Sequence, residues 1–182
     1  LEPISQRFKK ILDLEVIAES QSDLLEAAKG DYVIFCQAGD RFFPSLLKRF
    51  HLLIMDNPEV ALVYYDCEVQ EPKRPSPAPV FKPPTPSAAL CLSYNMFSRG
   101  LIRTKWLKKI IGRLHKQVDL LAVEYDACLK LLEADANIQH LPAVLVSQKK
   151  LSKPDSPQTV QTILDYLSRS GLQNPHAAQT PV

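Results

Sequence analysis

Polar side chains that can bind a ligand follow two predicted strands of this chain. The run Gln37-Ala38-Gly39-Asp40 comes directly after the first strand, and Asp66 ends the second. Because ligands bind outside the carboxyl ends of the strands in open α/β sheets, we expect these groups to form a ligand site at one sheet edge. The alternative is that Asp40 only caps a turn, since a short carboxylate accepts hydrogen bonds from nearby backbone N–H groups.

The elements that position these groups follow one another as strand, helix and strand. Tyr32–Cys36 is a short apolar run bounded by polar turns, which is typical of a strand buried on both faces in a mostly parallel sheet. Pro44 suits the first turn of a helix, and Asn57-Pro58 ends that helix. Ala61–Tyr65 is then the second predicted strand.

Segments on both sides extend this alternation. Ile11–Ile17 is typical of a strand and Ser22–Lys29 of a short helix, which predicts an α/β domain with a largely parallel sheet. Farther along the chain, Val118–Ala134 predicts a helix and Ile138–Val146 a strand. Pro142 places that last strand at a sheet edge, because proline cannot donate to a strand ladder.

The end of the chain predicts one more helix and a tail. The helix is expected to begin at Ser156-Pro157 and to end at Gly171. The 182 residues are therefore expected to form one domain over residues 1–171, followed by a flexible tail at 172–182.

A proline-rich segment interrupts this domain. Seven of the fifteen residues from Pro72 to Pro86 are proline, which excludes a helix and a central strand. We expect residues 72–87 to form an extended surface loop within the domain. A linker between two domains is the alternative.

Several residues of the second half of the chain could belong either to a binding site or to ordinary structure. Tyr94 and Asn95 could line a pocket, as amide and aromatic side chains at the start of a strand do. Alternatively Tyr94, Phe97 and Trp106 belong to the core, which we expect for at least two of the three. Glu124 lies near the polar flank or the leading end of its helix, where a solvated carboxylate is favoured by the helix dipole.

Composition excludes several classes of protein. Twenty-two basic and twenty acidic residues leave a net charge of +2, so no nucleic-acid partner is implied. No apolar run reaches the roughly eighteen residues of a membrane span, and the first residues do not resemble a signal peptide. The widely spaced cysteines are expected to be reduced core residues of a cytoplasmic protein; they are Cys36, Cys67, Cys91 and Cys128.

Three blocks of sequence resemble family-two glycosyltransferases of the GT-A fold, over roughly residues 15 to 150. The first block, which follows the family's order of strand, acidic turn, N-P-E and V-Y-x-D, comprises Gly30–Phe35, Pro44, Asn57-Pro58-Glu59 and Val63–Asp66. The second comprises Phe81-Lys82-Pro83, Pro86 and Leu92-Ser93-Tyr94-Asn95. The third comprises Glu124-Tyr125-Asp126 and His140–Leu145. The common order and spacing of the blocks carry the resemblance.

This resemblance implies both a fold and a reaction. The fold is a GT-A-like, mixed and mostly parallel sheet flanked by helices in three α/β/α layers. The reaction is transfer of a sugar from a nucleotide-diphosphate donor to a hydroxyl of a glycan or other acceptor, with inversion at the anomeric carbon. An inverting bacterial hexosyltransferase of surface polysaccharide biosynthesis is the expected protein.

The resemblance also implies roles for particular residues. The base that takes the acceptor's proton is expected at Glu124. Contacts with the acceptor or the donor sugar are expected from Tyr94, Asn95 and Asp66. The donor diphosphate, with a Mg²⁺ or Mn²⁺ ion that neutralises it, is expected at Gln37, Gly39 and Asp40, with Asp40 as the metal ligand.

The sequence departs from the family's pattern in two places. The metal-binding D-x-D reads Gln37-Ala38-Gly39, which leaves Asp40 as the carboxylate, and Ser147 or Gln148 stands where the family has a histidine or similar ligand. The family's opening strand and helix, which bind the nucleotide base, would precede Ile11. We therefore expect either a fragment of a longer enzyme, which the start without methionine favours, or a reduced relative.

Two other functions remain open at this point. A non-catalytic GT-A-like domain that binds a partner subunit, a glycan or another domain of a longer chain would account for the altered turn and for the proline-rich segment. A nucleotidyltransferase would share the architecture, but it would need a glycine-rich phosphate loop, and the chain has five glycines.

Overall fold

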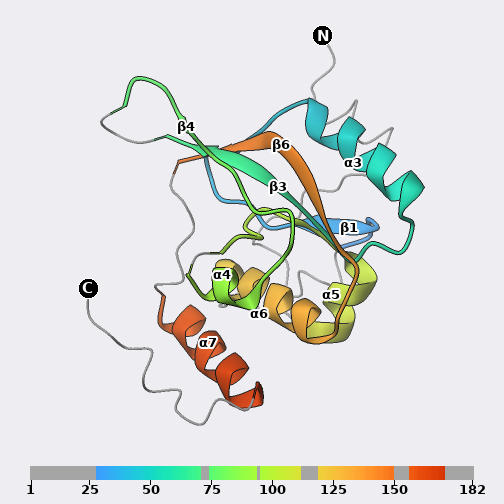
Figure 1. The fold of residues 1–182 in the computed structure, drawn as a ribbon, viewed down its shortest axis with the longest axis vertical. Coiled ribbons are helices and arrows are strands. Elements are labelled where there is room, and N and C mark those ends of the chain that lie inside the picture. Colours follow the sequence, from blue (N-terminus) through green and yellow to red (C-terminus); the bar gives the residue numbers. More distant parts are fainter. Residues whose placement is uncertain (1–27, 71–73, 94, 112–118, 150–155, 171–182) are drawn as a thin grey trace.

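A computed structural model describes residues 28–70, 74–93, 95–111, 119–149 and 156–170. The predicted strand at 11–17, nearly all of the predicted helix at 22–29, Tyr94 and the predicted tail lie outside these ranges. In chain order the elements of Figure 1 are β1 (Tyr32–Ile34), β2 (Arg41–Phe42), α3 (Ser45–Asp56), β3 (Leu62–Val69), β4 (Ala78–Val80), α4 (Ala88–Ser93), β5 (Leu101–Arg103), α5 (Thr104–Ile111), α6 (Leu120–Glu133), β6 (Ile138–Gln148) and α7 (Pro157–Arg169).

The described strands form one mixed sheet in the order β1-β5-β3-β6-β2, and β4 also pairs with β3. Only β3 and β6 run parallel; the other four pairings among the described strands are antiparallel. The predicted mixed sheet is therefore confirmed, whereas its mostly parallel character is wrong for this part of the chain. The physical reason is the connections: β3 and β4 are neighbours in sequence and fold back on each other, and a parallel pair needs a long crossover.

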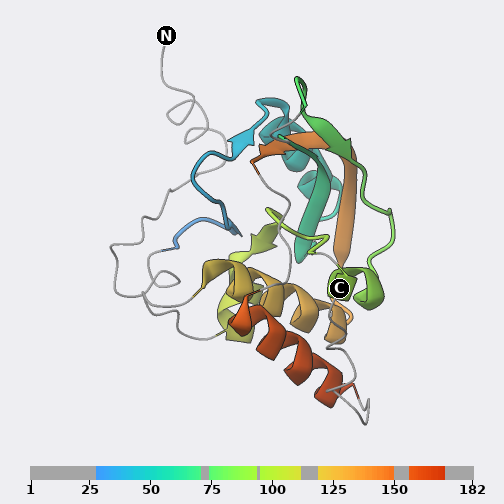
Figure 2. The ribbon, with the colours of Figure 1, turned by 90° about the vertical axis from the view of Figure 1, so that its left-hand side faces the viewer.

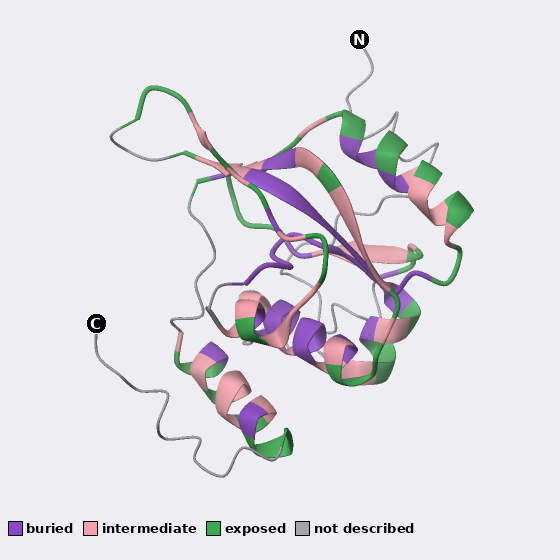
Figure 3. Cartoon of the chain, viewed as in Figure 1, coloured by how far each residue is buried: buried purple, intermediate pink, exposed green. Residues whose placement is uncertain are grey.

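Helices cover both faces of the sheet, as predicted. Helix α3 lies on one face, and α4, α5 and α6 lie on the other, with α7 packed outside α6 (Figures 1 and 2). One apolar cluster, which includes Phe50 of α3, fills the first interface, and a second cluster, which includes Leu129 of α6, fills the other. Strand β3 is buried between the two clusters (Figure 3).

Local signals fix the ends of the helices. Pro44 is the N-cap residue of α3, and Asn57 is its C-cap residue, as the sequence predicted. Ser156 caps α7 by accepting a hydrogen bond from the Thr159 N–H at 3.2 Å, with a proline at the first helical position. Helix α7 ends at Arg169, and Gly171, its predicted end, lies outside the described residues.

The strand β6 corrects one prediction. It is not an edge strand along its whole length, because β2 pairs with its residues Val146 and Ser147. Pro142 lies at a register shift, where Tyr65 is opposite Leu141 but Asp66 is opposite Val144. Among the described strands only β3 lies beside β6 at Pro142, so the proline has both the predicted edge position and a bulge position, and both tolerate a residue without an N–H.

The proline-rich segment and the cysteines give two further outcomes. Residues 78–80 are extended as predicted, and they form the short strand β4 with Pro79 opposite Glu68. The four cysteines are all free. Of these, Cys67, Cys91 and Cys128 are buried as predicted. Cys36 is exposed, so its assignment to the core is wrong, because β1 ends at Ile34 before reaching it.

Candidate functional site

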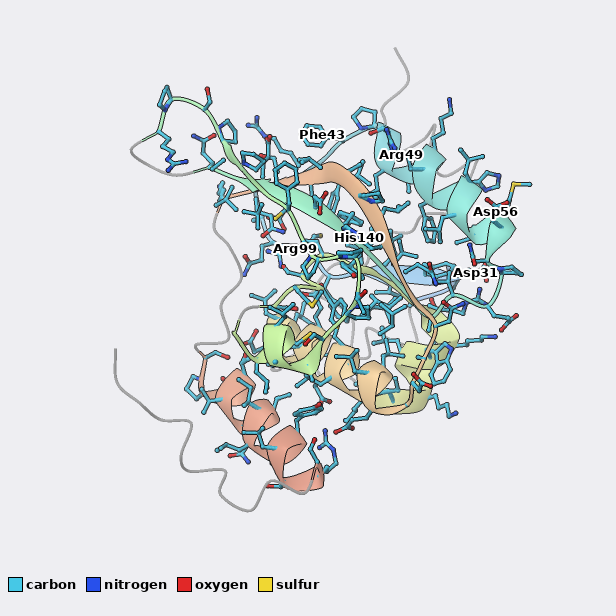
Figure 4. The ribbon with its side chains drawn as sticks, in the orientation of Figure 1. Asp31, Phe43, Arg49, Asp56, Arg99 and His140 are labelled. Atoms are coloured by element: carbon cyan, nitrogen blue, oxygen red, sulfur yellow. The ribbon has the colours of Figure 1, made fainter. Side chains whose placement is uncertain are left out.

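The side chain of Arg99 is at the centre of the candidate site. It lies in the turn between α4 and β5, between the sheet and the helices (Figure 4). Its side chain is 0% exposed, and its backbone adopts φ = 65°, a left-handed conformation that costs a non-glycine residue roughly 1–2 kcal/mol. A buried charge in a strained turn requires compensating partners.

The guanidinium of Arg99 finds those partners in the turn after β1. Its Nε donates to Oδ2 of Asp40 in a buried ion pair, and its Nη2 donates to Oε1 of Gln37 at 2.9 Å. Its Nη1 donates to the Ser98 hydroxyl at 3.3 Å and lies 3.9 Å from Oε2 of Glu124. One cation therefore connects the predicted donor turn with the predicted base.

The turn itself is closed by Asp40. Oδ2 of Asp40 accepts from the Gln37 N–H at 2.8 Å, and the Asp40 N–H donates to the Gln37 carbonyl at 3.0 Å. Gly39 adopts φ = 96°, and a Cβ there would meet Cε of Lys149 at 2.2 Å. Asp40 thus caps its turn, as the sequence-based alternative held, and also pairs with Arg99.

Glu124 is fully buried, so its interpretation as a solvated charge is wrong. Helix α6 packs against α4, α5 and α7, which buries more than one of its faces. Oε1 of Glu124 accepts from the Arg99 backbone N–H at 2.7 Å, and Oε2 accepts from Nδ2 of Asn95 at 3.4 Å. Burial raises the pKa of Glu124 to about 7, although Arg99 and Lys82 oppose the shift.

Asp66 belongs to a second cluster. Its Oδ1 accepts from the Lys82 backbone N–H at 2.8 Å and lies 3.0 Å from Nε2 of His140. The His140 ring stacks on Tyr64, with 4.7 Å between ring centroids. Lys82 is also buried, and its Nζ donates to the Ser98 carbonyl at 3.3 Å. Burial lowers the pKa of Lys82, an effect that nearby Glu124 and Asp66 oppose.

The structure thus groups the predicted site residues unequally. Gln37, Asp40, Asn95 and Glu124 meet around Arg99, whereas Asp66 makes its contacts with Lys82 and His140. Gly39 shapes the turn next to Lys149. Three aromatic residues are core candidates, and at least two are expected in the core. Phe97 is buried in the core and Trp106 packs against it, which confirms that expectation.

Sequence reasoning did not single out Arg99, and it noticed Lys82 only as part of a pattern. The available signal was a basic residue inside an otherwise apolar segment, between Phe97 and Leu101. A charge in such a position is expected to need a buried counter-charge. The sequence does not show which of its carboxylates supplies that counter-charge.

The residues present do not fit a divalent cation. Within the described ranges, no group of three or more histidine, cysteine, aspartate or glutamate side chains could hold a metal ion. In the turn, Oδ2 of Asp40 and Oε1 of Gln37 both accept from Arg99, and Gly39 supplies no side-chain oxygen. Hard cations need several oxygen ligands, with carboxylates among them.

A cavity of about 740 Å³ lies elsewhere, between the start of β1 and the start of α5. Its lining includes the basic residues Lys29, Arg103, Lys105 and Lys108. Arg103 is already engaged, because its Nε donates to the Val60 carbonyl at 2.9 Å. The cavity is lined by none of the residues around Arg99, so it is separate from the candidate site.

Comparisons with known proteins place this geometry in context. No protein-family model matches the chain. The O-antigen biosynthesis protein RfbC of Myxococcus xanthus is 27% identical over 156 residues, which cover 86% of this chain and 12% of RfbC. The crystal structure of S. aureus TarS 1-349 matches with a TM-score of 0.54 at 18% identity, covering 80% of this chain and 42% of that one.

This chain has a glycosyltransferase-like fold. The predicted α/β sheet flanked by helices is thereby confirmed. The chain spans a small part of RfbC and less than half of the TarS chain. None of the helices in the described part of the chain has the length and apolar character needed to cross a membrane.

Proposed function

We propose that this chain forms part of an inverting family-two glycosyltransferase of the GT-A fold that acts in bacterial surface polysaccharide biosynthesis, in the cytoplasm. The name of the relative RfbC and the fold shared with TarS support this proposal. The observation that carries it is the meeting of Gln37, Asp40, Asn95 and Glu124 around one buried arginine. These residues come from separate segments to which the resemblance assigns the donor, the acceptor and the base.

In this proposal Glu124 is the general base. Its pKa of about 7 lies near neutral pH, where a base is partly ionised and still basic enough to take a proton. The acceptor's O–H proton passes to the carboxylate as the acceptor oxygen bonds to the anomeric carbon and the bond to the leaving diphosphate breaks. The Arg99 N–H and the Asn95 amide orient the carboxylate for this step. Because Glu124 is fully buried, the acceptor must displace a group that covers it.

The test is sugar transfer by the full chain. UDP-, GDP- and dTDP-hexoses would be supplied with oligosaccharide acceptors, and the released nucleoside diphosphate and the glycosylated product would be quantified by mass spectrometry. We expect turnover with one donor and at least a hundredfold loss in Glu124→Gln, since general-base catalysis contributes roughly 10²–10⁴-fold.

Glu133→Gln is the matched control, because it is the same substitution at the other end of α6. Glu133 pairs with Arg169 at the surface, away from the site. Unchanged turnover in Glu124→Gln would exclude Glu124 as the base. Equal losses in both variants would indicate a general effect on α6.

A second candidate function is a non-catalytic module that binds a glycan or another part of a longer protein. The specific observation that favours it is closure of the site: the side chains of Arg99 and Glu124 are 0% exposed and that of Asp40 is 4% exposed. Saturable glycan binding that survives Glu124→Gln, together with no release of nucleoside diphosphate from any donor, would favour the module over the enzyme.

A further inference from the structure

The guanidinium of Arg99 occupies the side of the turn that a divalent cation would need. Oδ2 of Asp40 accepts from Nε of Arg99 and from the Gln37 N–H, and Oε1 of Gln37 accepts from Nη2 of Arg99. Gly39, between them, has no side chain to offer. Oδ2 of Asp40 and Oε1 of Gln37 are therefore already paired with a cation.

The carboxylates around Arg99 also have cations beside them without a metal. The buried carboxylates of Asp40 and Glu124 are accompanied by the buried cations Arg99 and Lys82. A divalent ion at Asp40 would add two positive charges next to a guanidinium in a region of low dielectric. Two neighbouring positive charges repel each other strongly there, because burial weakens the screening by water.

The backbone of Arg99 is anchored, which fixes the point from which its side chain reaches the turn. Its carbonyl accepts a hydrogen bond from the buried hydroxyl of Tyr65, and its N–H donates to Glu124 at 2.7 Å. Gly100 follows in close contact, since a Cβ there would lie 2.8 Å from the Phe97 carbonyl. Moving the guanidinium out to admit a metal would break its ion pair with Asp40 and its hydrogen bond to Gln37, and would take the cation away from Glu124.

We propose that the Arg99 guanidinium takes the place of a divalent cation in this chain, and that the turn Gln37–Asp40 works without metal. The arginine is a positioning residue that fixes the turn and Glu124 relative to each other. One consequence rests on the proposed function: binding of a nucleoside diphosphate at this turn will be insensitive to EDTA. The cation replacement itself does not depend on sugar transfer.

The test uses Mn²⁺ alone, measured by the electron paramagnetic resonance signal of the free ion, with the full chain. We expect equimolar wild-type chain to leave the free-ion signal unchanged up to millimolar concentrations. Stoichiometric signal loss that Asp40→Asn abolishes would overturn the proposal. Signal loss that persists in Asp40→Asn would place the bound Mn²⁺ outside the turn, and the proposal would stand. Asp126→Asn, at a surface ion pair on α6, is the matched control.

Two variants separate the arginine from the number of carboxylates. Gln37→Asp adds a second carboxylate to the turn but keeps Arg99, so we expect it to remain without Mn²⁺ binding. Gln37→Asp combined with Arg99→Gln removes the competing cation and is expected to bind Mn²⁺ at least tenfold more tightly. Stoichiometric binding by Gln37→Asp alone would overturn the proposal, even where circular dichroism shows the double variant to be unfolded.

This test is independent of the transfer assay. Absence of sugar transfer with no Mn²⁺ binding would reject the proposed function and keep the arginine's role. Sugar transfer that requires Mn²⁺ at Asp40 would support the proposed function and reject the arginine's role as a replacement for the metal.

Discussion

Asp40 and Asp66 have similarly buried side chains, 4% and 6% exposed, yet their partners differ. The sequence predicts both at strand ends, but Asp66 lies inside β3 and Asp40 in the turn before β2. Asp40 pairs with the guanidinium of Arg99, whose planar fork of donors suits a carboxylate. Asp66 is held by the Lys82 backbone N–H and the His140 ring. Equal burial therefore gives two different roles: Asp40 belongs to a charge network, and Asp66 ties neighbouring segments of the chain together.

Lys82 joins these two regions. Its backbone N–H is bound to Asp66, while its Nζ reaches the Ser98 carbonyl, next to Arg99. The Asp66 cluster therefore holds the segment after β4 in place, and that segment supplies the second buried cation near Glu124. Removing a charge from the Arg99 network is expected to cost more than removing one from the Asp66 cluster.

The largest effect is expected for Arg99→Met. The substitution preserves much of the volume but leaves the carboxylates of Asp40 and Glu124 buried without their cation. Breaking a buried ion pair by removing one partner typically costs about 3–5 kcal/mol. Urea unfolding followed by circular dichroism measures the loss of free energy of unfolding.

Arg169→Met provides the surface reference for this measurement. Arg169 pairs with Glu133 at 3.0 Å, and both side chains are partly exposed, so its loss should cost less than about 1 kcal/mol. Equal costs for the two arginines would remove the distinction between the Arg99 network and an ordinary surface pair.

The elements around this network could be predicted because their signals are local. Pro44 and Ser156 mark the starts of α3 and α7, and the apolar run Ala61–Tyr65 marks the first half of β3. Strand directions could not be predicted in the same way. They depend on which strands meet, and β5 pairs with both β1 and β3 through contacts distant in sequence.

The centre of the site could be predicted only in part. The resemblance pointed to Asp40, Asn95 and Glu124, which do meet. The side chain that unites them, Arg99, is 59 residues from Asp40 and 25 from Glu124. The sequence places Glu124 near the polar flank of α6 because helical periodicity does not reveal that the turn carrying Asn95 and Arg99 packs there.

The second prediction concerns pH and Glu124→Gln. Burial raises the pKa of Glu124 from 4.5 to about 7; of the facing charges, Asp40 adds to the rise and Arg99 and Lys82 oppose it. Between these pH values the folded chain binds a proton that the unfolded chain releases, so the free energy of unfolding falls as pH rises. Relative to Glu124→Gln, which cannot titrate there, the wild type should lose roughly 3 kcal/mol across this window.

Urea unfolding of both chains at intervals from pH 4.5 to 8 measures this difference. The difference between the two chains should change up to about pH 7 and then level off, while Glu133→Gln should track the wild type throughout. A constant difference between wild type and Glu124→Gln would mean that Glu124 titrates normally and is not part of a buried network.

The smallest effect distinguishes the two aspartates directly. Asp40→Asn keeps an acceptor oxygen but removes the charge facing Arg99, and hydrogen bonds to charged groups contribute more than neutral ones, so we expect a loss of about 2 kcal/mol. Asp66→Asn keeps an acceptor for the Lys82 N–H and should cost only about 1 kcal/mol. Thermal and urea unfolding of both variants, with Asp126→Asn as the surface reference, measure the order. A larger loss at Asp66 would show that the Asp66 cluster, and not the arginine, contributes more to the stability of this part of the molecule.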